Sequence, residues 1–313
     1  MAHPSELPPR EGKTGLPEVP YGTVIGHDYM IVRPLRKGTQ AALYVVEQLS
    51  TAGQRAMKLL RREYVSDETL YKRFEREAQV AAKIPSEHVV QVIAAGIDAK
   101  LNIPWISMEL LEGQNLGDYV AEVGSLPKGA VLTILEQICH AVAAAHSLGI
   151  VHRDLKPANV FLSNAHRVGT QTTVKILDFG VAKIIAESLT LSGVQLGTPA
   201  WMAPEQTRGD PAMPTTDVWA LGLIAFYMFT GKQFWRTMQG QNSLDQHMAV
   251  MGEIGNEPIP IASIRALELG VPGKLPVGFD PWFAQCVARL QSDRFMNAGA
   301  AFRALANAID ERA

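Results

Sequence analysis

The sequence predicts an α+β protein in two parts, a small antiparallel sheet with one helix followed by a mainly helical region. Between residues 29 and 110, short runs with strand composition alternate with turn residues. Beyond residue 112, apolar residues recur at helical spacing instead. The chain has 313 residues, of which 47% are apolar and 19% charged, as expected of a soluble protein with a sizeable core. We therefore expect two compact parts that meet near residue 112.

The first part is predicted to hold five short strands and one amphipathic helix. The strands are expected at residues 29–35, 42–48, 55–60, 89–97 and 104–110. The helix is expected at 67–83, with Phe74 and Ala78 on its apolar face. Residues 1–20 carry five prolines among small and charged residues, so we expect a disordered, proline-rich tail there.

The second part is predicted to be helical around one short strand. Apolar spacing indicates a helix at 128–148 that ends at Gly149, and a short strand at 174–177. The stretch 217–229 is apolar on all sides and predicts a fully buried helix. Two helices are expected to close the chain, and they cover about 281–290 and 297–310. The glycine- and proline-rich stretch 231–280 supports no functional interpretation.

Charge and composition exclude several kinds of partner. The net charge is −2 and no basic run stands out, which argues against nucleic acid or an anionic membrane as the main partner. No apolar segment follows the N-terminus, and the longest apolar run, 218–229, is too short to span a bilayer. Cys139 and Cys286 fall in apolar helical patterns, which favours buried free thiols in a reducing compartment. We therefore expect a cytoplasmic protein without a membrane anchor.

The stretch 150–159 carries the clearest chemistry. Asp154 and Asn159 lie five residues apart with Lys156 between them, a combination suited to phosphoryl transfer. The carboxylate can orient an attacking hydroxyl and accept its proton, the ammonium can neutralise charge on the phosphoryl group, and the amide can hold Mg²⁺. Pro157 fixes φ and predicts a stiff loop rather than a helix. Most loops of mixed charge are merely solvated, so this interpretation depends on the rest of the chain.

A lysine and a glutamate in the first part indicate a buried ion pair. Lys58 lies on the third expected strand between apolar residues, and by itself it is also compatible with an exposed edge strand. Glu77 lies on the apolar face of helix 67–83, where a carboxylate is costly unless it meets a cation. Lys58 is its natural partner, so we expect the two to pair.

The ordered set of motifs resembles the eukaryotic-like (Hanks-type) serine/threonine protein kinases, most of all the bacterial ones, across residues 28–310. The resemblance implies a bilobal kinase fold, with an N-lobe at 21–111 and a helical C-lobe at 112–313. It also implies transfer of the γ-phosphoryl group of ATP to serine or threonine hydroxyls of proteins. The motif residues are Lys58, Glu77, His152-Arg153-Asp154, Asn159, Asp178-Phe179-Gly180, Ala203-Pro204-Glu205, Asp217 and Arg294.

The resemblance further assigns roles within the site. Met108 is the expected gatekeeper, Asn159 and Asp178 hold Mg²⁺ or alternatively Mn²⁺, and Asp217 bonds back to the catalytic loop. Arg294 is expected to pair with Glu205, because a charge buried in this lobe needs an opposite one. The residues expected around ATP are Leu35, Gly38, Leu43, Ala56, Lys58, Glu77, Met108, Phe161 and Asp178, together with the backbone of Glu109 and Leu111.

One departure from the family pattern leaves two alternatives open. The phosphate loop retains only Gly38 of its three glycines, with Arg36 and Ala41 at the outer positions, which makes it stiffer. This departure supports a pseudokinase that binds nucleotide or acts as a scaffold. A small-molecule kinase of the aminoglycoside-phosphotransferase type is the other alternative. Such enzymes lack the segment 197–205 that shapes a peptide-docking surface.

Regulation by phosphorylation is also implied by the resemblance. Arg153 precedes the catalytic Asp154, and in kinases of this pattern that arginine binds a phosphate on the activation segment. Thr190 and Ser192 are the expected acceptors, whereas the position of Thr198 suits a hydroxyl that bonds to the catalytic loop. Phosphorylation in trans would require a transient homodimer. The expected partners are protein substrates with serine or threonine acceptors.

Overall fold

The computed structural model contains two compact units. The first holds the described residues up to 83 together with 90–112, and the second holds 84–89 and the described residues from 113 onward. The division falls within one residue of the expected boundary. The segment 84–89 was not expected in the second unit, and it lies there because Val89 bridges Ile176 and the amide of Ile176 donates to His88 (2.7 Å). The structure describes residues 10–11, 17–37, 41–61, 72, 74, 78–79, 82–164, 172–179, 199–236 and 244–310.

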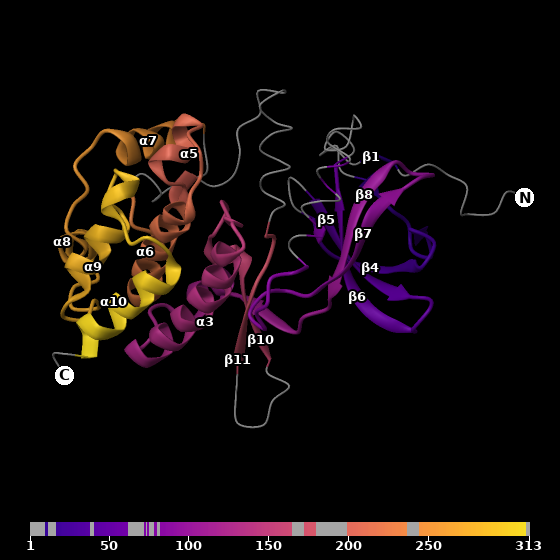
Figure 1. The fold of residues 1–313 in the computed structure, drawn as a ribbon, viewed down its shortest axis with the longest axis horizontal. Helices are drawn as coiled ribbons and strands as arrows, with labels where there is room; N and C mark the ends of the chain where they lie inside the picture. The colour runs from indigo at the N-terminus through magenta and orange to yellow at the C-terminus, as the bar shows by residue number, and fades with distance from the viewer. Residues whose placement is uncertain are drawn as a thin grey trace, which may run out of the picture. The chain divides into compact units, whose positions relative to one another are not determined.

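The first unit is built on an antiparallel sheet, and Figure 1 labels its strands β4 to β8. The strand order is β3-β4-β5-β6-β8-β7. All five expected strands are present. The sixth, β3, is only two residues long, too short for an alternating pattern to be readable in the sequence. The strands are β3 Val24–Ile25, β4 Tyr29–Lys37, β5 Ala41–Gln48, β6 Gly53–Leu60, β7 Val92–Asp98 and β8 Ile103–Glu109.

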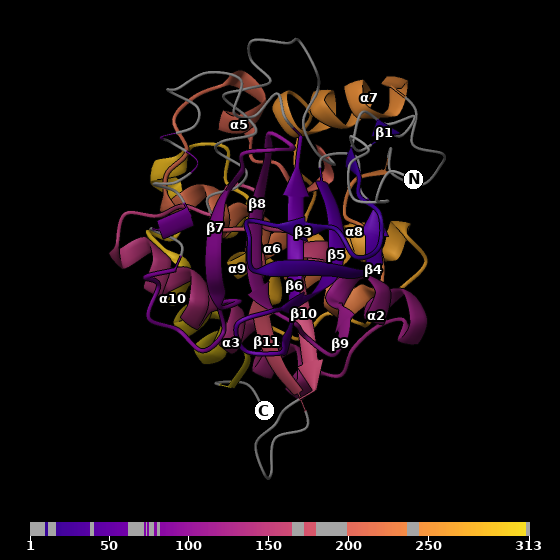
Figure 2. The same cartoon turned by 90° about the vertical axis from the view of Figure 1, so that its right-hand side faces the viewer.

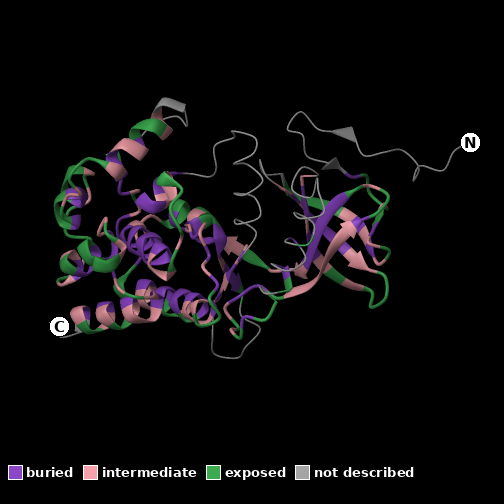
Figure 3. Cartoon of the chain, turned by 45° about the horizontal axis from the view of Figure 1, so that its top comes forward, coloured by how far each residue is buried: buried purple, intermediate pink, exposed green. Residues whose placement is uncertain are grey.

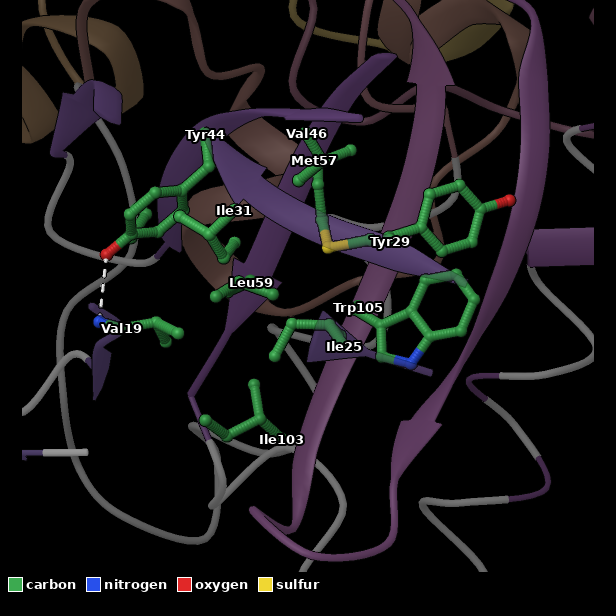
Figure 4. Packing of buried hydrophobic residues seen from close by; sticks show 11 residues of the cluster. Val19, Ile25, Tyr29, Ile31, Tyr44, Val46, Met57, Leu59, Ile103 and Trp105 are labelled. Carbon is green, nitrogen blue, oxygen red and sulfur yellow. Dashed lines mark hydrogen bonds between the residues drawn. The ribbon is translucent and has the colours of Figure 1, made fainter. Parts of the chain in front are cut away.

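One face of this sheet carries a hydrophobic cluster (Figure 4). Alternate residues of the strands contribute to it, because successive side chains of a strand point to opposite faces. Trp105 packs against Tyr29 with ring centroids 5.3 Å apart. A Cβ added to Gly26, whose φ is +58°, would lie 2.5 Å from the Trp105 ring, so only glycine fits there. The labelled members are Val19, Ile25, Tyr29, Ile31, Tyr44, Val46, Met57, Leu59, Ile103 and Trp105.

The N-terminal boundary expected at residue 21 needs correction. Val19 is buried in the cluster, and its amide donates to the Tyr44 hydroxyl (3.3 Å; Figure 4). Further upstream, β1 (Arg10–Glu11) pairs with β2 (Pro17–Glu18). The fold therefore begins inside the segment expected to be a tail. High proline content does not prevent short extended pairings or the burial of one valine.

Most of the helix expected at 67–83 lies outside the described residues. Phe74 and Ala78 are described as helical and buried, as their apolar spacing predicts. Glu77 lies outside the described residues, so its pairing with Lys58 stays a prediction.

The second unit is organised around helix α6 (Pro214–Thr230), which is buried along almost its whole length (Figure 3). This is the buried helix that the apolar run predicts. It packs against α3 (Lys128–Ser147), α9 (Phe279–Cys286) and α10 (Ala298–Asp310). Helix α6 comes so close to α9 that a Cβ on Gly222 would lie 2.7 Å from the Cβ of Cys286.

Helix α3 agrees with its expected bounds and ends at Gly149, whose φ is +73°. Of the described helices, it alone has the length and apolar composition that could cross a membrane. Its apolar side is buried and it packs against β11, α6 and α10, the environment of a core helix. Cys139 of α3 and Cys286 of α9 are buried free thiols, and burial raises the pKa of both.

A three-stranded sheet in the order β11-β10-β9 completes the second unit (Figure 2). Only β11 was expected, at 174–177, whereas β9 and β10 were not. The remaining elements are short. They are β9 Gly113–Asn115, α2 Leu116–Val123, η3 Pro157–Asn159, β10 Val160–Asn164, β11 Thr172–Ile176, η4 Pro199–Trp201, α5 Pro204–Arg208, α7 Leu244–Gly255, α8 Ala262–Glu268 and η6 Gln291–Asp293.

Candidate active site

The loop that precedes the 3₁₀ turn η3 is fixed by hydrogen bonds to one buried carboxylate, that of Asp217. Asp217 of α6 accepts the amide of His152 at 2.8 Å and the amide of Arg153 at 3.0 Å. It also pairs with His146 Nε2 at 2.8 Å. Arg153 is left-handed (φ +69°), a conformation that costs a non-glycine residue roughly 1–2 kcal/mol and persists only where the surroundings enforce it. The expected bond from Asp217 to this loop is therefore present.

His152 connects the loop to the segment that carries Asp178. Its Nε2 lies 2.8 Å from the carbonyl of Leu177, and its Nδ1 lies 3.3 Å from the amide of Asp154. A carbonyl can only accept and an amide can only donate, so Nε2 donates to Leu177 and Nδ1 accepts from Asp154. The ring also meets the buried Phe179 edge-on, with centroids 4.7 Å apart. The two motif segments are thus bonded and packed together.

Asp154, Lys156 and Asn159 form one polar cluster. Lys156 Nζ lies 2.9 Å and 2.8 Å from the two carboxylate oxygens of Asp154. Asn159 Nδ2 donates to the Asp154 carbonyl (2.7 Å) and to Asp154 Oδ2 (3.1 Å). Asn159 belongs to the 3₁₀ turn η3, with Pro157 at its first position, where the sequence predicted a stiff loop rather than a helix. Proline fits there because the first residue of a helix needs no N–H partner.

The residues expected to hold a metal suit Mg²⁺ in chemistry. Asn159 Nδ2 donates both of its hydrogens to Asp154. Its Oδ1 is therefore the atom that could bind a metal. Asp178 supplies a carboxylate on a left-handed backbone (φ +65°). Mg²⁺ prefers oxygen ligands and takes few from the protein when phosphates supply the rest. Within the described residues no group of three or more His, Cys, Asp and Glu side chains is placed to bind a metal.

In the first unit, strand register gathers four residues expected around ATP on one face of the sheet. Leu43 pairs with Lys58, and Ala56 pairs with Met108. Paired residues share a face, and so do residues two apart on one strand. This face is opposite the hydrophobic cluster, since the intervening Met57 belongs to that cluster. Because side chains alternate along each strand, one face of the sheet carries the hydrophobic cluster and the other carries the residues expected around ATP.

The other expected site residues fall in three groups. Leu35 lies at a bulge of β4 and is partly exposed, and the Glu109 amide donates to the Gln91 carbonyl (3.0 Å). Phe161 of β10 pairs with Asn115 and Lys175, and Leu111 follows β8. Several expected residues lie outside the described residues and remain untested. These are Gly38, Glu77, Gly180, Thr190, Ser192 and Thr198.

The ion pair expected between Arg294 and Glu205 is present and buried. Arg294 Nη1 and Nη2 lie 2.7 Å and 2.8 Å from the two carboxylate oxygens. Thr216 also donates to Glu205 Oε1 (2.8 Å). Burial alone would raise the pKa of Glu205, but the hydrogen bonds and charge of Arg294 outweigh burial and lower the pKa below its ordinary value. The pair joins α5 to the turn after α9.

Two polar residues near the catalytic loop were not identified from the sequence. One is His146, whose Nε2 bonds to the Asp217 carboxylate that also fixes the loop. The other is Gln206, whose Nε2 donates to the carbonyl of Arg153 (2.6 Å). The only local signal for Gln206 is its place three residues after Ala203, the helix cap, where glutamine often bonds back to the cap amide.

Comparison with known proteins agrees with this geometry. The sequence matches the family described as protein kinase domain over residues 29–266, so the chain belongs to the protein kinase family. The similar curated proteins include bacterial serine/threonine kinases. The chain is 38% identical to the serine/threonine-protein kinase Pkn1 of Myxococcus xanthus over 233 residues, covering 74% of this chain but 32% of Pkn1.

Other relatives and one solved fold extend the comparison. Identity to PknL of Mycobacterium tuberculosis is 31% over 285 residues, which covers 90% of this chain and 66% of PknL. The chain spans about a third of the length of PrkC of Bacillus subtilis, to which it is 34% identical (32% of PrkC covered). The crystal structure of the M. tuberculosis PknI kinase domain superposes with a TM-score of 0.69 at 24% identity, covering 93% and 99% of the two chains. At that identity the superposition supports the fold alone.

Proposed function

We propose that this protein is a serine/threonine protein kinase that transfers the γ-phosphoryl group of Mg-ATP to hydroxyls of proteins. The observation that carries the proposal is the bonded cluster of Asp154, Lys156 and Asn159 on a loop that Asp217 holds in place. Fold similarity alone would not support an activity, whereas this cluster supplies the groups that the chemistry needs.

Each side chain of the cluster has a separate role in the proposed reaction. Asp154 orients the attacking hydroxyl and accepts its proton at a carboxylate oxygen. Lys156, whose ammonium lies within 2.9 Å of both carboxylate oxygens of Asp154, can neutralise charge on the phosphoryl group. Asn159 and Asp178 would hold Mg²⁺, which when bound neutralises phosphate charge. In the first unit, Lys58 would position the α- and β-phosphates.

A protein rather than a small molecule is the favoured acceptor. The turn η4 and helix α5 form the end of the segment that shapes a peptide-docking surface in this family. Trp235 Nε1 donates to the Ala200 carbonyl (2.8 Å), and Trp201 meets Tyr227 edge-on with centroids 5.8 Å apart. These contacts fix the segment in place, which favours a peptide over a small molecule such as an aminoglycoside as the phosphoryl acceptor.

Regulation is proposed to follow the bacterial kinases. Phosphorylation in trans at Thr190, Ser192 or both would create a charged group for Arg153, and Thr198 would bond to the catalytic loop. Phosphorylation in trans requires a transient homodimer. The proposed setting is bacterial signalling in the cytoplasm. Replacing both acceptors by alanine should lower activity toward an external substrate, and full activity of that double variant would refute the scheme.

An autophosphorylation assay tests the main proposal. Purified protein with Mg-ATP should become labelled and should label a generic basic protein, with phosphate on serine or threonine. Calorimetry should detect Mg-ATP binding in the usual substrate range, on the order of 1 μM–1 mM. Nucleotide binding without any phosphoryl transfer would favour the pseudokinase alternative instead.

A further inference from the structure

The side chain of Gln206 makes two hydrogen bonds that lead to different parts of the site. Its Oε1 accepts the amide of Ala203, the cap of helix α5 (3.0 Å). Its Nε2 donates to the carbonyl of Arg153 (2.6 Å). The cap explains the first bond as ordinary helix stabilisation. The second leaves the helix and reaches the residue directly before Asp154.

The backbone that receives this second bond is strained. The backbone of Arg153 has a left-handed conformation, and its amide donates to Asp217. The Arg153 carbonyl belongs to the same peptide unit as the amide of Asp154, which donates to His152 Nδ1 (3.3 Å). That peptide plane sets the direction in which the Asp154 side chain leaves the loop. Gln206 therefore fixes the carbonyl of Arg153, while Asp217 fixes its amide.

We propose that Gln206 is a positioning residue for the catalytic carboxylate, acting through its hydrogen bond to the Arg153 carbonyl. A small hollow lined by Asp154, Trp201 and Gln206 among others adjoins this bond. The same amide thus ties the orientation of Asp154 to the segment that would receive a peptide. This inference rests on the proposed kinase function and adds a residue to its machinery.

Replacing Gln206 by glutamate separates the two hydrogen bonds. The change is isosteric, and the new carboxylate can still accept the Ala203 amide, but when ionised it cannot donate to the Arg153 carbonyl. Protonation restores a donor. The Arg153 carbonyl oxygen favours the protonated form of the introduced carboxyl, whereas the Ala203 amide favours its ionised form.

The experiment compares the full chain and its Gln206→Glu variant in a peptide kinase assay. We expect kcat to fall on the order of 10-fold near neutral pH, less than the ~100-fold that a 1 Å misplacement can cost, with KM for ATP unchanged. The ratio of variant to wild-type kcat should rise as the pH is lowered from about 8 to about 5.5, as the introduced carboxyl gains its proton. A purely structural cap has no reason to show that recovery.

Two further variants complete the design. Gln206→Met loses both hydrogen bonds, so it should show a low kcat with no recovery in acid. Gln291→Glu is the matched control, since the Gln291 side chain also donates to a backbone carbonyl, that of Pro211 (3.3 Å), on an exposed turn outside the site. It should keep the wild-type kcat ratio at every pH. Wild-type kcat in Gln206→Met, or a ratio for Gln206→Glu that does not change with pH, would overturn the proposal.

Amide hydrogen exchange keeps the test independent of turnover. Gln206→Glu should speed exchange of the amides from Asp154 to Lys156 at neutral pH, and acid should reduce the difference from wild type after correction for intrinsic rates. If the wild-type protein transfers no phosphate, the proposed function fails, and this measurement still decides about Gln206. Unchanged exchange in that segment would overturn the inference.

Discussion

Two carboxylate–cation pairs in the second unit have nearly the same separation but differ in their exposure to solvent. Asp154 and Lys156 lie 2.8 Å apart with side chains 31% and 20% exposed. Glu205 and Arg294 lie 2.7 Å apart with side chains 2% and 0% exposed. Distance alone would class them together. Their exposure and remaining hydrogen bonds indicate that one pair is available for chemistry and the other maintains the fold.

The buried pair leaves no donor unused. Besides Glu205, Arg294 donates from Nε to the Ala288 carbonyl (2.6 Å), from Nη1 to Thr215 (3.0 Å) and from Nη2 to Arg289 (3.3 Å). Its guanidinium also lies over the Trp219 ring, 5.0 Å from the centroid. A buried charge is tolerable only when it is satisfied in this way. Lys156, by contrast, meets solvent and can turn toward a substrate.

The largest expected effect is chemical, and Asp154→Asn should produce it. Removing the base should lower kcat by about 10²–10⁴-fold, because proton transfer in the transition state loses its acceptor. The free energy of unfolding should change little, since the side chain is partly exposed and asparagine keeps a hydrogen-bond acceptor for Lys156. Kinase assays and urea unfolding of the same preparation measure both. Wild-type turnover in this variant would remove Asp154 from the mechanism.

Breaking the buried pair should instead lower the stability of the fold. Arg294→Met leaves the Glu205 carboxylate buried without its cation, and the cost is about 3–5 kcal/mol of unfolding free energy. Urea unfolding should show the loss. The double variant Glu205→Leu/Arg294→Met should recover part of it, because no charge then remains buried. If the single and double variants are equally unstable, packing against Trp219 rather than charge holds this turn.

A smaller effect is expected in the dependence of stability on pH. The pKa of Glu205 is lowered in the folded protein, so the unfolded chain takes up the proton first as the pH falls. The contribution of Glu205 to stability is therefore complete above its ordinary pKa of 4.5 and is lost as the pH falls below that value through the folded pKa. Thermal unfolding of wild type and Glu205→Gln over this range should show a shallower acid dependence in the variant. Identical slopes would mean that Glu205 does not titrate differently on unfolding.

The smallest effect should come from a surface pair. Arg208 and Asp210 lie 2.8 Å apart, but their side chains are 56% and 50% exposed. Arg208→Ala should change the free energy of unfolding by less than about 1 kcal/mol and leave kcat unchanged, because solvent screens such a pair. A loss as large as that expected for Arg294→Met would show that exposure does not separate the two kinds of ion pair.

Much of this organisation can be read from the sequence. Strand alternation predicts the five main strands and helical spacing predicts α3, because burial of one face imposes a period on the residues. Helix α6 is predicted instead by a run that is apolar on all sides, because it is buried all round. The pairing of Arg294 with Glu205 could be expected since a buried charge needs a partner. The order of motifs around Asp154 and Asp178 was enough to indicate the family and the chemistry proposed for it.

Other features depend on contacts that leave no local pattern. Gln206 meets Arg153 53 positions away in the sequence, and His146 meets Asp217 71 positions away. A polar side chain shows no periodicity that reveals its distant partner, so both residues could be recognised only in three dimensions. The burial of Val19 and the short strands β3 and β9 belong to the same class, because segments this short gain their structure from the sheet or cluster that receives them. Sequence periodicity thus determined which surfaces are buried, while the tertiary structure decided which polar groups meet beside Asp154.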